Sequence, residues 1–334
     1  MKSRYIIIAL AALLLGGCEK VLDIDDSDAH DLMVLNAVPQ AGKRAFVNFT
    51  STHFFLDSVA AYPVDGATLT LWVNGNPYSV DSVSRCKYFF GHVLQPLDQL
   101  AIDITTPKGN VHAETYVPRQ PAVSGPLVIG WRSPTFNFFM TPFTVTDSSG
   151  YAEYYNLTVT IRDSGLVKEP QQNNRQRLKD TVSHTYFALL NNDDITSYEV
   201  TPNAALGGLL YSGLMFTDKL IDGRTNYPVN LFIPLIKDTN EIADAEHTFK
   251  HWYTITLESI TPARMRYLIS VAQTNSMTSF FAEQSQPYTN VSGALGIFGG
   301  SAKWSYTFDA DTVNFISTPT VPDFLPAKLP IPIR

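Results

Sequence analysis

Apolar residues recur at every second position in many short segments of this chain, and this alternation limits the possible fold more than any other feature. Leu69, Leu71 and Val73 share one face of an expected strand, and Asn74-Gly75 directly after them is a strong signal for a hairpin turn. The same period recurs at residues 100–104, 111–117, 155–161, 253–257 and 304–308. Strands this close together predict antiparallel sheets rather than alternating strands and helices. We therefore expect a mainly β chain with two antiparallel, immunoglobulin-like β-sandwich domains.

The length of 334 residues suits about two domains. Prolines and a Ser-Gly pair interrupt the chain after residue 117, and we place the domain boundary there. The predicted N-terminal sandwich covers residues 32–119, and the C-terminal one covers 120–317. Residues 318–334 hold five prolines and are expected to form an extended, Pro-rich tail.

Two segments of the second domain depart from the strand pattern. Residues 163–183 are polar, and we predict a loop there. Thr261-Pro262 has the residue types of a helix N-cap followed by proline at the first helical position. Met265, Leu268 and Ile269 then follow helical spacing. We expect one short helix near residues 262–273.

The first eighteen residues indicate export. Lys2 and Arg4 precede an apolar run of eleven residues, which suits a secretory signal and is short for a membrane span. Leu15-Gly16-Gly17-Cys18 resembles a bacterial lipobox, which implies a signal peptide over 1–17 and acyl chains (palmitate) on Cys18. An ordinary secretory signal is the alternative. Residues 18–31 are acidic and are expected to be a tether, which resembles the surface-export signal of Bacteroidota lipoproteins.

A glycine-rich stretch near the C-terminus carries a family resemblance. Tyr288 to Gly300 has the sequence YTNVSGALGIFGG, and Phe216 to Gly223 has the sequence FTDKLIDG. These stretches and their order along the chain resemble the Bacteroidota surface lipoproteins labelled domain of unknown function 4249. That resemblance implies a protein often encoded beside a SusC-like TonB-dependent receptor, and it implies no catalytic residues. From the residues alone, we expect the glycine run to be a bulged strand rather than a ligand loop.

Few residues point to catalysis or to metal binding. The chain lacks a Gly-x-Ser-x-Gly elbow and a His-Glu-x-x-His motif. His247 and His251 are four residues apart, but the strand pattern around them argues against a metal site. Cys86 is expected to be an inert strand residue. We therefore predict no catalytic residues, no cofactor, no metal and no enzymatic activity.

A short Asp-Ser/Thr-aliphatic motif occurs four times and resembles the O-glycosylation motif of Bacteroidota. The residues that would carry glycans are Ser58, Ser82, Thr181 and Thr312. The alternative is that each motif is a turn that leads into a strand.

These observations favour an accessory or binding protein, anchored by lipid to the outer membrane and facing outwards. The expected partner is a TonB-dependent receptor of the SusC type, or another outer-membrane protein, in nutrient uptake. A sequence pI near 5.5 argues against nucleic-acid binding. Two alternatives remain open: a component of an outer-membrane assembly or export machinery, and a surface hydrolase of glycans or peptides. The aromatic residues Trp131, Phe136, Phe138 and Phe139 are candidates for interface contacts, or for core packing.

Overall fold

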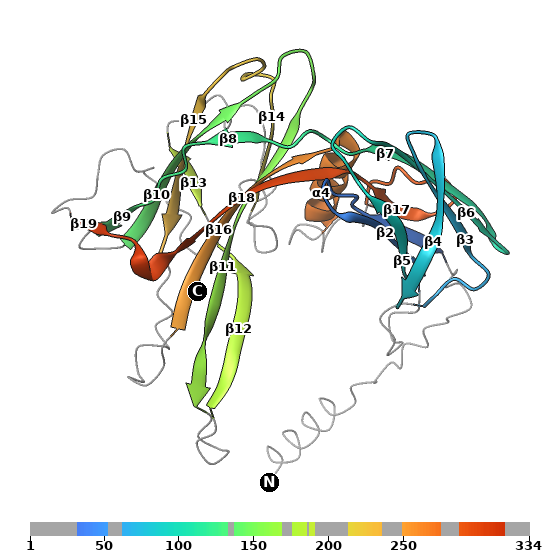
Figure 1. Cartoon of the computed structure of the whole chain (residues 1–334), viewed down its shortest axis with the longest axis horizontal. Helices are drawn as coiled ribbons and strands as arrows, with labels where there is room; N and C mark the ends of the chain where they lie inside the picture. The colour runs from blue at the N-terminus through green and yellow to red at the C-terminus, as the bar shows by residue number, and fades with distance from the viewer. Residues whose placement is uncertain are drawn as a thin grey trace, which may run out of the picture.

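The computed structural model describes residues 32–52, 62–132, 137–168, 176–185, 187–190, 213–235, 249–274 and 287–317. These residues form two lobes of β-strands, with the helix α4 (Pro262–Thr274) lying between them (Figure 1). The mainly β fold class expected from the sequence is confirmed. In the described part of the chain, no helix combines the length and the apolar character that a membrane span requires.

The first lobe is one eight-stranded sheet that curls around its own core. Its strand order is β17-β1-β2-β5-β4-β3-β6-β7. The core is built from side chains of strands along the whole sheet and includes Leu35, Phe49, Phe90 and Ile102, which are fully buried. The strands are β1 (Met33–Ala37), β2 (Arg44–Ser51), β3 (Thr68–Val73), β4 (Asn76–Ser84), β5 (Lys87–Val93), β6 (Gln99–Thr106), β7 (Gly109–Tyr116) and β17 (Leu295–Phe298).

The alternation of apolar and polar residues determines which face of each strand packs into this core. Leu69, Leu71 and Val73 on β3 are buried, as their spacing predicted. Asn74 and Gly75 have φ values of 51° and 80°, so both central residues of the β3–β4 turn are left-handed. This is the geometry that a two-residue hairpin between twisted strands requires.

Cys86 corrects one sequence prediction, because it lies in a turn and not in a strand. Arg85 and Cys86 form the two-residue connection between β4 and β5, with φ values of 47° and 65°. The turn contains neither glycine nor asparagine, the residues by which such turns are usually recognised. The sequence therefore contained no sign that the strand ends before Cys86.

The glycine run forms the last strand of the first lobe. β17 pairs in parallel with β1, with Leu35 opposite Gly296, and Ile297 and Phe298 are buried. Just before β17, Ser292 forms a bridge with His112 of β7. The segment therefore connects the two ends of the curled sheet, and it is a strand, as the residues alone indicated.

Two of the glycines in this segment approach β7 and its end so closely that no other residue fits. A Cβ added at Gly293, where φ is +79°, would lie well inside 3.0 Å of the Asn110 carbonyl oxygen. A Cβ added at Gly300 would meet the Tyr116 carbonyl oxygen in the same way. Real Cβ atoms do not approach backbone so closely, so these glycines allow the segment to pack against β7.

The second lobe is a two-sheet sandwich. One sheet has the order β13-β15-β10-β9-β19, with β8 paired to β10, and the other has the order β12-β11-β16-β18, with β14 paired to β11. Phe139 on β10 joins the sheets, since its ring lies 5.2 Å from those of Tyr253 and Phe308 on the opposite sheet. The elements are β8 (Ala122–Ser124), β9 (Ile129–Arg132), β10 (Asn137–Thr146), β11 (Tyr154–Lys168), β12 (Gln176–His184), β13 (Ala188–Leu190), β14 (Gly213–Thr217), β15 (Tyr227–Pro234), β16 (Phe249–Ile260), β18 (Ser301–Asp309), the 3-10 turn η3 (Ala310–Thr312) and β19 (Phe315–Ser317).

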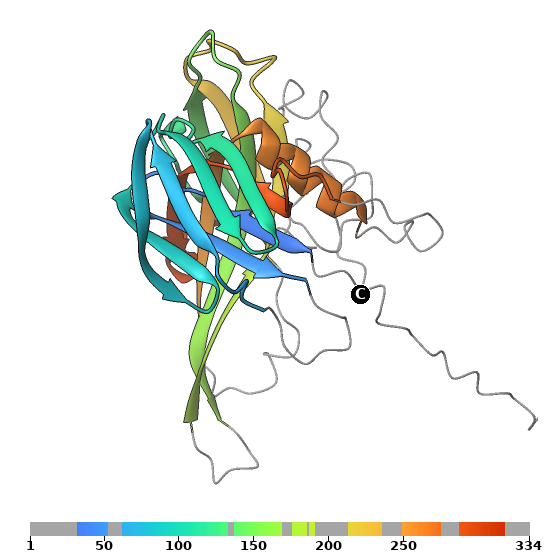
Figure 2. The same ribbon diagram turned by 90° about the vertical axis from the view of Figure 1, so that its right-hand side faces the viewer.

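The polar segment 163–183 is not a loop over its described residues, which corrects the sequence prediction. β11 continues to Lys168, and β12 pairs with it antiparallel from Gln176 to His184. The hairpin extends away from both lobes (Figures 1 and 2). Leu178 and Val182 are largely exposed there. Backbone pairing holds the two strands together, with polar contacts such as the Arg162–Asp180 ion pair at 2.7 Å.

The predicted helix is present as α4. Its N-terminus follows Thr261, whose carbonyl accepts from the Met265 N–H at 3.0 Å. Met265 packs against Met215 and Ile260, which attaches the helix to the second lobe. Close by, the buried Glu258 carboxylate lies 2.8 Å from Arg264 of α4.

Candidate functional site

A cavity of about 430 Å³ lies where the two lobes meet, and we call it the junction pocket. Its first wall comes from the β5–β6 connection, the start of β6, the end of β7 and the segment after β7. Its second wall comes from the β10–β11 connection, the start of β11 and the end of β16. The lining residues are Leu97, Gln99, Tyr116, Pro118 and Arg119 on the first wall, and Gly150, Tyr151, Ala152, Glu153, Tyr154, Ser259 and Ile260 on the second.

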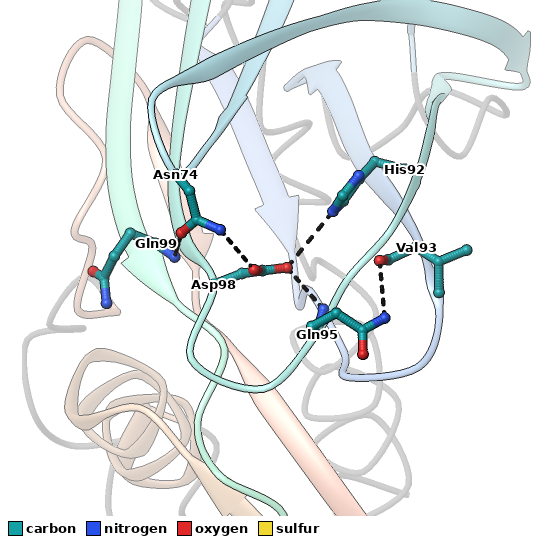
Figure 3. A network of polar contacts seen from close by, with 6 residues as sticks. All are labelled: Asn74, His92, Val93, Gln95, Asp98 and Gln99. Atoms are coloured by element: carbon teal, nitrogen blue, oxygen red, sulfur yellow. Dashed lines mark hydrogen bonds and ion pairs between the residues drawn. The ribbon is translucent and has the colours of Figure 1, made fainter.

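A buried aspartate organises the first wall (Figure 3). Asp98 accepts hydrogen bonds from the Gln95 backbone N–H at 2.7 Å and from the Asn74 amide at 2.8 Å. The His92 ring nitrogen lies 3.6 Å from the same carboxylate. In return, the Asn74 amide oxygen accepts from the Gln99 backbone N–H at 2.9 Å. The network therefore fixes the chain on both sides of Leu97 at the pocket rim.

Leu97 itself has an unusual backbone. Its φ of 73° lies in the left-handed region, which costs a bulky residue roughly 1–2 kcal/mol. Its N–H donates to the Val117 carbonyl at 2.7 Å, and the Val117 N–H donates to the Asp98 carbonyl at 2.9 Å. These bonds hold the strained backbone in place. The outcome is an exposed leucine side chain at the mouth of the pocket.

Several polar groups of the pocket make no hydrogen bond with the described residues. These groups are the hydroxyls of Tyr116 and Tyr154 and the side-chain amide of Gln99. Arg119 has no carboxylate within ion-pair distance in the described part of the chain, and its guanidinium lies 4.0 Å from the ring centre of Tyr151. The lining thus combines aromatic surface with donors that are free to bind a ligand.

An acidic cluster lies behind the second wall. Asp147, Asp218 and Asp222 each place a carboxylate oxygen within 4.8 Å of the others, so they could hold a metal ion. Asp147 accepts from the Gly223 N–H at 2.8 Å, and Asp218 accepts from the Glu153 N–H at 2.6 Å. A set of oxygen ligands of this kind suits Ca²⁺ or Mg²⁺.

Glu153 connects this acidic cluster to the junction pocket. Its carboxylate contacts the buried Tyr155 hydroxyl, which also lies 3.2 Å from Asp147. Burial, together with a hydrogen bond and charge repulsion from Asp147, raises the pKa of Glu153 to about 7, although the bond from Tyr155 opposes the shift. Burial likewise raises the pKa of Asp218. A carboxyl group at the pocket therefore changes charge near neutral pH.

The residues that the sequence singled out do not meet at this pocket. Ser82 lies on β4, Thr181 on β12 and Thr312 in η3, and all three are exposed. Cys18, Ser58 and the segments 1–31 and 318–334 lie outside the described residues.

The other candidates are accounted for by packing and pairing. Phe138 and Phe139 are fully buried core residues and Trp131 is half-buried, while Phe136 lies outside the described residues. His251 bonds Asp163 at 2.7 Å, and its predicted neighbour His247 is likewise outside the described residues.

Sequence reasoning missed the residues of the junction pocket. Gln99, Tyr116 and Tyr154 belong to different strands, and no short motif contains them. Asp218 and Asp222 do lie in the Phe216–Gly223 stretch, but their relation to Asp147 depends on the fold. Comparison with protein-family models and with curated proteins finds no match for this chain.

Proposed function

We propose that the chain is a lipid-anchored accessory protein of the outer-membrane surface. It binds a small ligand in the junction pocket and works beside a TonB-dependent receptor of the SusC type, or another outer-membrane protein, in nutrient uptake. The observation that carries the binding role is the junction pocket itself, whose aromatic lining holds polar groups that make no hydrogen bond with the described residues.

The composition of the pocket supports binding more than catalysis. Its volume falls in the range of about 300–1,000 Å³ that is typical of small-molecule sites. The lining residues include no histidine or cysteine, and the serine among them, Ser259, has no hydrogen-bond partner among the described residues that could activate it. A strained residue, Leu97, is held at the rim by a dedicated network, which is common where a surface has been shaped for a ligand.

The position beside a receptor is supported by the N-terminal sequence. Acyl chains on Cys18 would restrict the protein to the membrane plane, and the acidic tether would let its lobes reach a neighbouring barrel. Confinement of this kind raises the effective concentration of a membrane partner, so modest intrinsic affinity is enough for pairing.

Affinity purification from membranes in mild detergent tests this proposal. We expect the tagged protein to bring down an outer-membrane barrel, and the Cys18→Ala variant to lose it. Ala152→Trp places an indole in the junction pocket, so small molecules detected by mass spectrometry with the wild type should be absent from this variant. Ala122→Trp, at an exposed alanine on β8, is the matched control. Recovery of the protein alone, without barrel or small molecule, would count against the proposal.

One observation favours a hydrolase as a second candidate. Glu153 lies at the pocket with the Asp147 carboxylate behind it, and a pocket carboxyl group whose pKa is raised to about 7 has the properties of a general acid. If the pocket is catalytic, the purified protein will turn over fluorogenic glycosides or peptides, and Glu153→Gln will abolish the turnover. Binding without turnover supports the accessory role.

A further inference from the structure

We infer that the ligand of the junction pocket is a neutral sugar of mono- or disaccharide size. This inference rests on the proposed binding function and adds the chemical class of the ligand. It follows from three properties of the lining: which polar groups are free, how the charges balance and where the apolar surface lies.

The free polar groups are mainly hydroxyl and amide groups. Tyr116 and Tyr154 each offer a phenolic hydroxyl, which both donates and accepts, and Gln99 offers an amide with the same two abilities. Such groups match a ligand that itself presents many hydroxyls. A purely apolar ligand would leave all three without partners, at a cost of about 1–3 kcal/mol for each group that it shields from water.

The charges on the two walls of the pocket have opposite signs. Arg119 on the first wall attracts an anion and repels a cation, whereas Glu153 on the second wall, with the carboxylates of Asp147 and Asp218 behind it, does the reverse. A ligand with a single charge is therefore repelled by one wall while it is attracted by the other. The Tyr155 hydroxyl already donates to Glu153, and the Arg119 guanidinium lies over the Tyr151 ring. A neutral ligand avoids both penalties.

The apolar part of the lining has the form that a sugar ring requires. Tyr151 and Leu97 are more than half exposed at the rim, and Pro118 and Ile260 lie deeper. A pyranose ring has C–H groups on its faces and hydroxyls around its edge. It can therefore place a face on this apolar surface while its edge reaches the tyrosine and glutamine groups.

Ligand-observed NMR with the purified full-length protein tests the ligand class. The probes are methyl glycosides of three kinds: neutral hexoses, hexuronates and hexosamines, together with neutral disaccharides. We expect saturation transfer from the protein to at least one neutral sugar, and weaker or no transfer to the charged sugars of the same ring geometry.

Two substitutions test whether the sugar binds in the junction pocket. Tyr154→Phe removes only a hydroxyl and Gln99→Ala removes an amide, so each should weaken the neutral sugar about three- to tenfold, the equivalent of one hydrogen bond. Tyr306→Phe is the matched control, because it removes the hydroxyl of a half-buried tyrosine on β18, outside the pocket, and it should leave the affinity unchanged.

The outcomes separate the ligand class from the binding function. If a hexuronate or a hexosamine binds more tightly than its neutral counterpart, and the pocket variants weaken it, the pocket binds ligands but the inferred class is wrong. If no sugar binds while Ala152→Trp still removes a co-purified small molecule of another class, the same conclusion holds. If no probe binds and no co-purified molecule depends on the pocket, the proposed function fails together with this inference.

Discussion

Replacing Gly293 by alanine tests whether the glycine run truly closes the first lobe. Gly293 has a φ of +79°, and an added Cβ would lie 3.3 Å from the Asn110 carbonyl carbon and much closer to its oxygen. The backbone must therefore move away from β7. The neighbouring Ser292 exchanges two backbone hydrogen bonds with His112, at 2.9 and 3.1 Å, and that movement would weaken both.

The expected cost has separable parts. The left-handed φ alone costs alanine about 1 kcal/mol. Displacing packed backbone costs about 1–3 kcal/mol, and weakened hydrogen bonds add about 1 kcal/mol. We expect Gly293→Ala to lower the free energy of unfolding by about 3–5 kcal/mol in total.

Gly42→Ala is the matched control for this experiment. Its φ of +72° is nearly the same, but nothing lies within 4 Å of an added Cβ. It should therefore lose only about 1 kcal/mol. Urea unfolding of both variants measures the difference, and amide hydrogen exchange at His112 and Ser292 reports whether the bridge opens. Equal losses in the two variants, with unchanged exchange at the bridge, would refute the close approach.

Three further predictions concern charge and anchoring. Because the folded pKa of Glu153 is raised from 4.5 to about 7, the stability it contributes at low pH is lost as pH rises. The urea concentration at the unfolding midpoint should therefore decrease as the pH rises from about 5 to about 8. Glu153→Gln should remove this decrease. Arg264→Ala should lower the free energy of unfolding by about 3 kcal/mol at neutral pH. It removes the nearer of the two cations beside the buried Glu258 and leaves the half-exposed Lys303, at 3.3 Å, and the Asn156 amide, at 3.4 Å. Although burial raises the pKa of Glu258, Arg264 and Lys303 lower it overall, so this loss should shrink in acid as Glu258 is protonated. Cys18→Ala should move the protein out of the membrane fraction, and an unchanged distribution would refute lipidation there.

Local sequence predicted the elements that carry a clear short pattern. The alternation of Leu69, Leu71 and Val73 placed β3, and Thr261-Pro262 placed the start of α4. The β11–β12 hairpin was missed because its exposed strands bury little on either face, so they lack the apolar period that the prediction uses. The polar composition of this segment favours a loop, but pairing of β11 with β16 and contacts across the hairpin make it a strand.

The junction pocket could not be predicted in the same way. Gln99, Tyr116 and Tyr154 become neighbours only when the two lobes dock. Docking depends on glycines that have no Cβ and so let two backbone segments come close together. The glycine run was recognisable in the sequence. Its partner, the Tyr116 carbonyl opposite Gly300, was not.

The parallel pairing of β1 with β17 also has a consequence for how this chain folds. The pairing joins residues about 260 positions apart, so the loop that it closes spans nearly the whole described chain. Contacts between residues this distant in sequence form late, because closing the loop between them costs conformational entropy before the contacts themselves contribute any stability. Until then, β1 presents an unpaired edge to any neighbouring strand, which is a hazard for aggregation. The two lobes are therefore expected to complete their folding together, as one cooperative unit, rather than one after the other as the chain emerges.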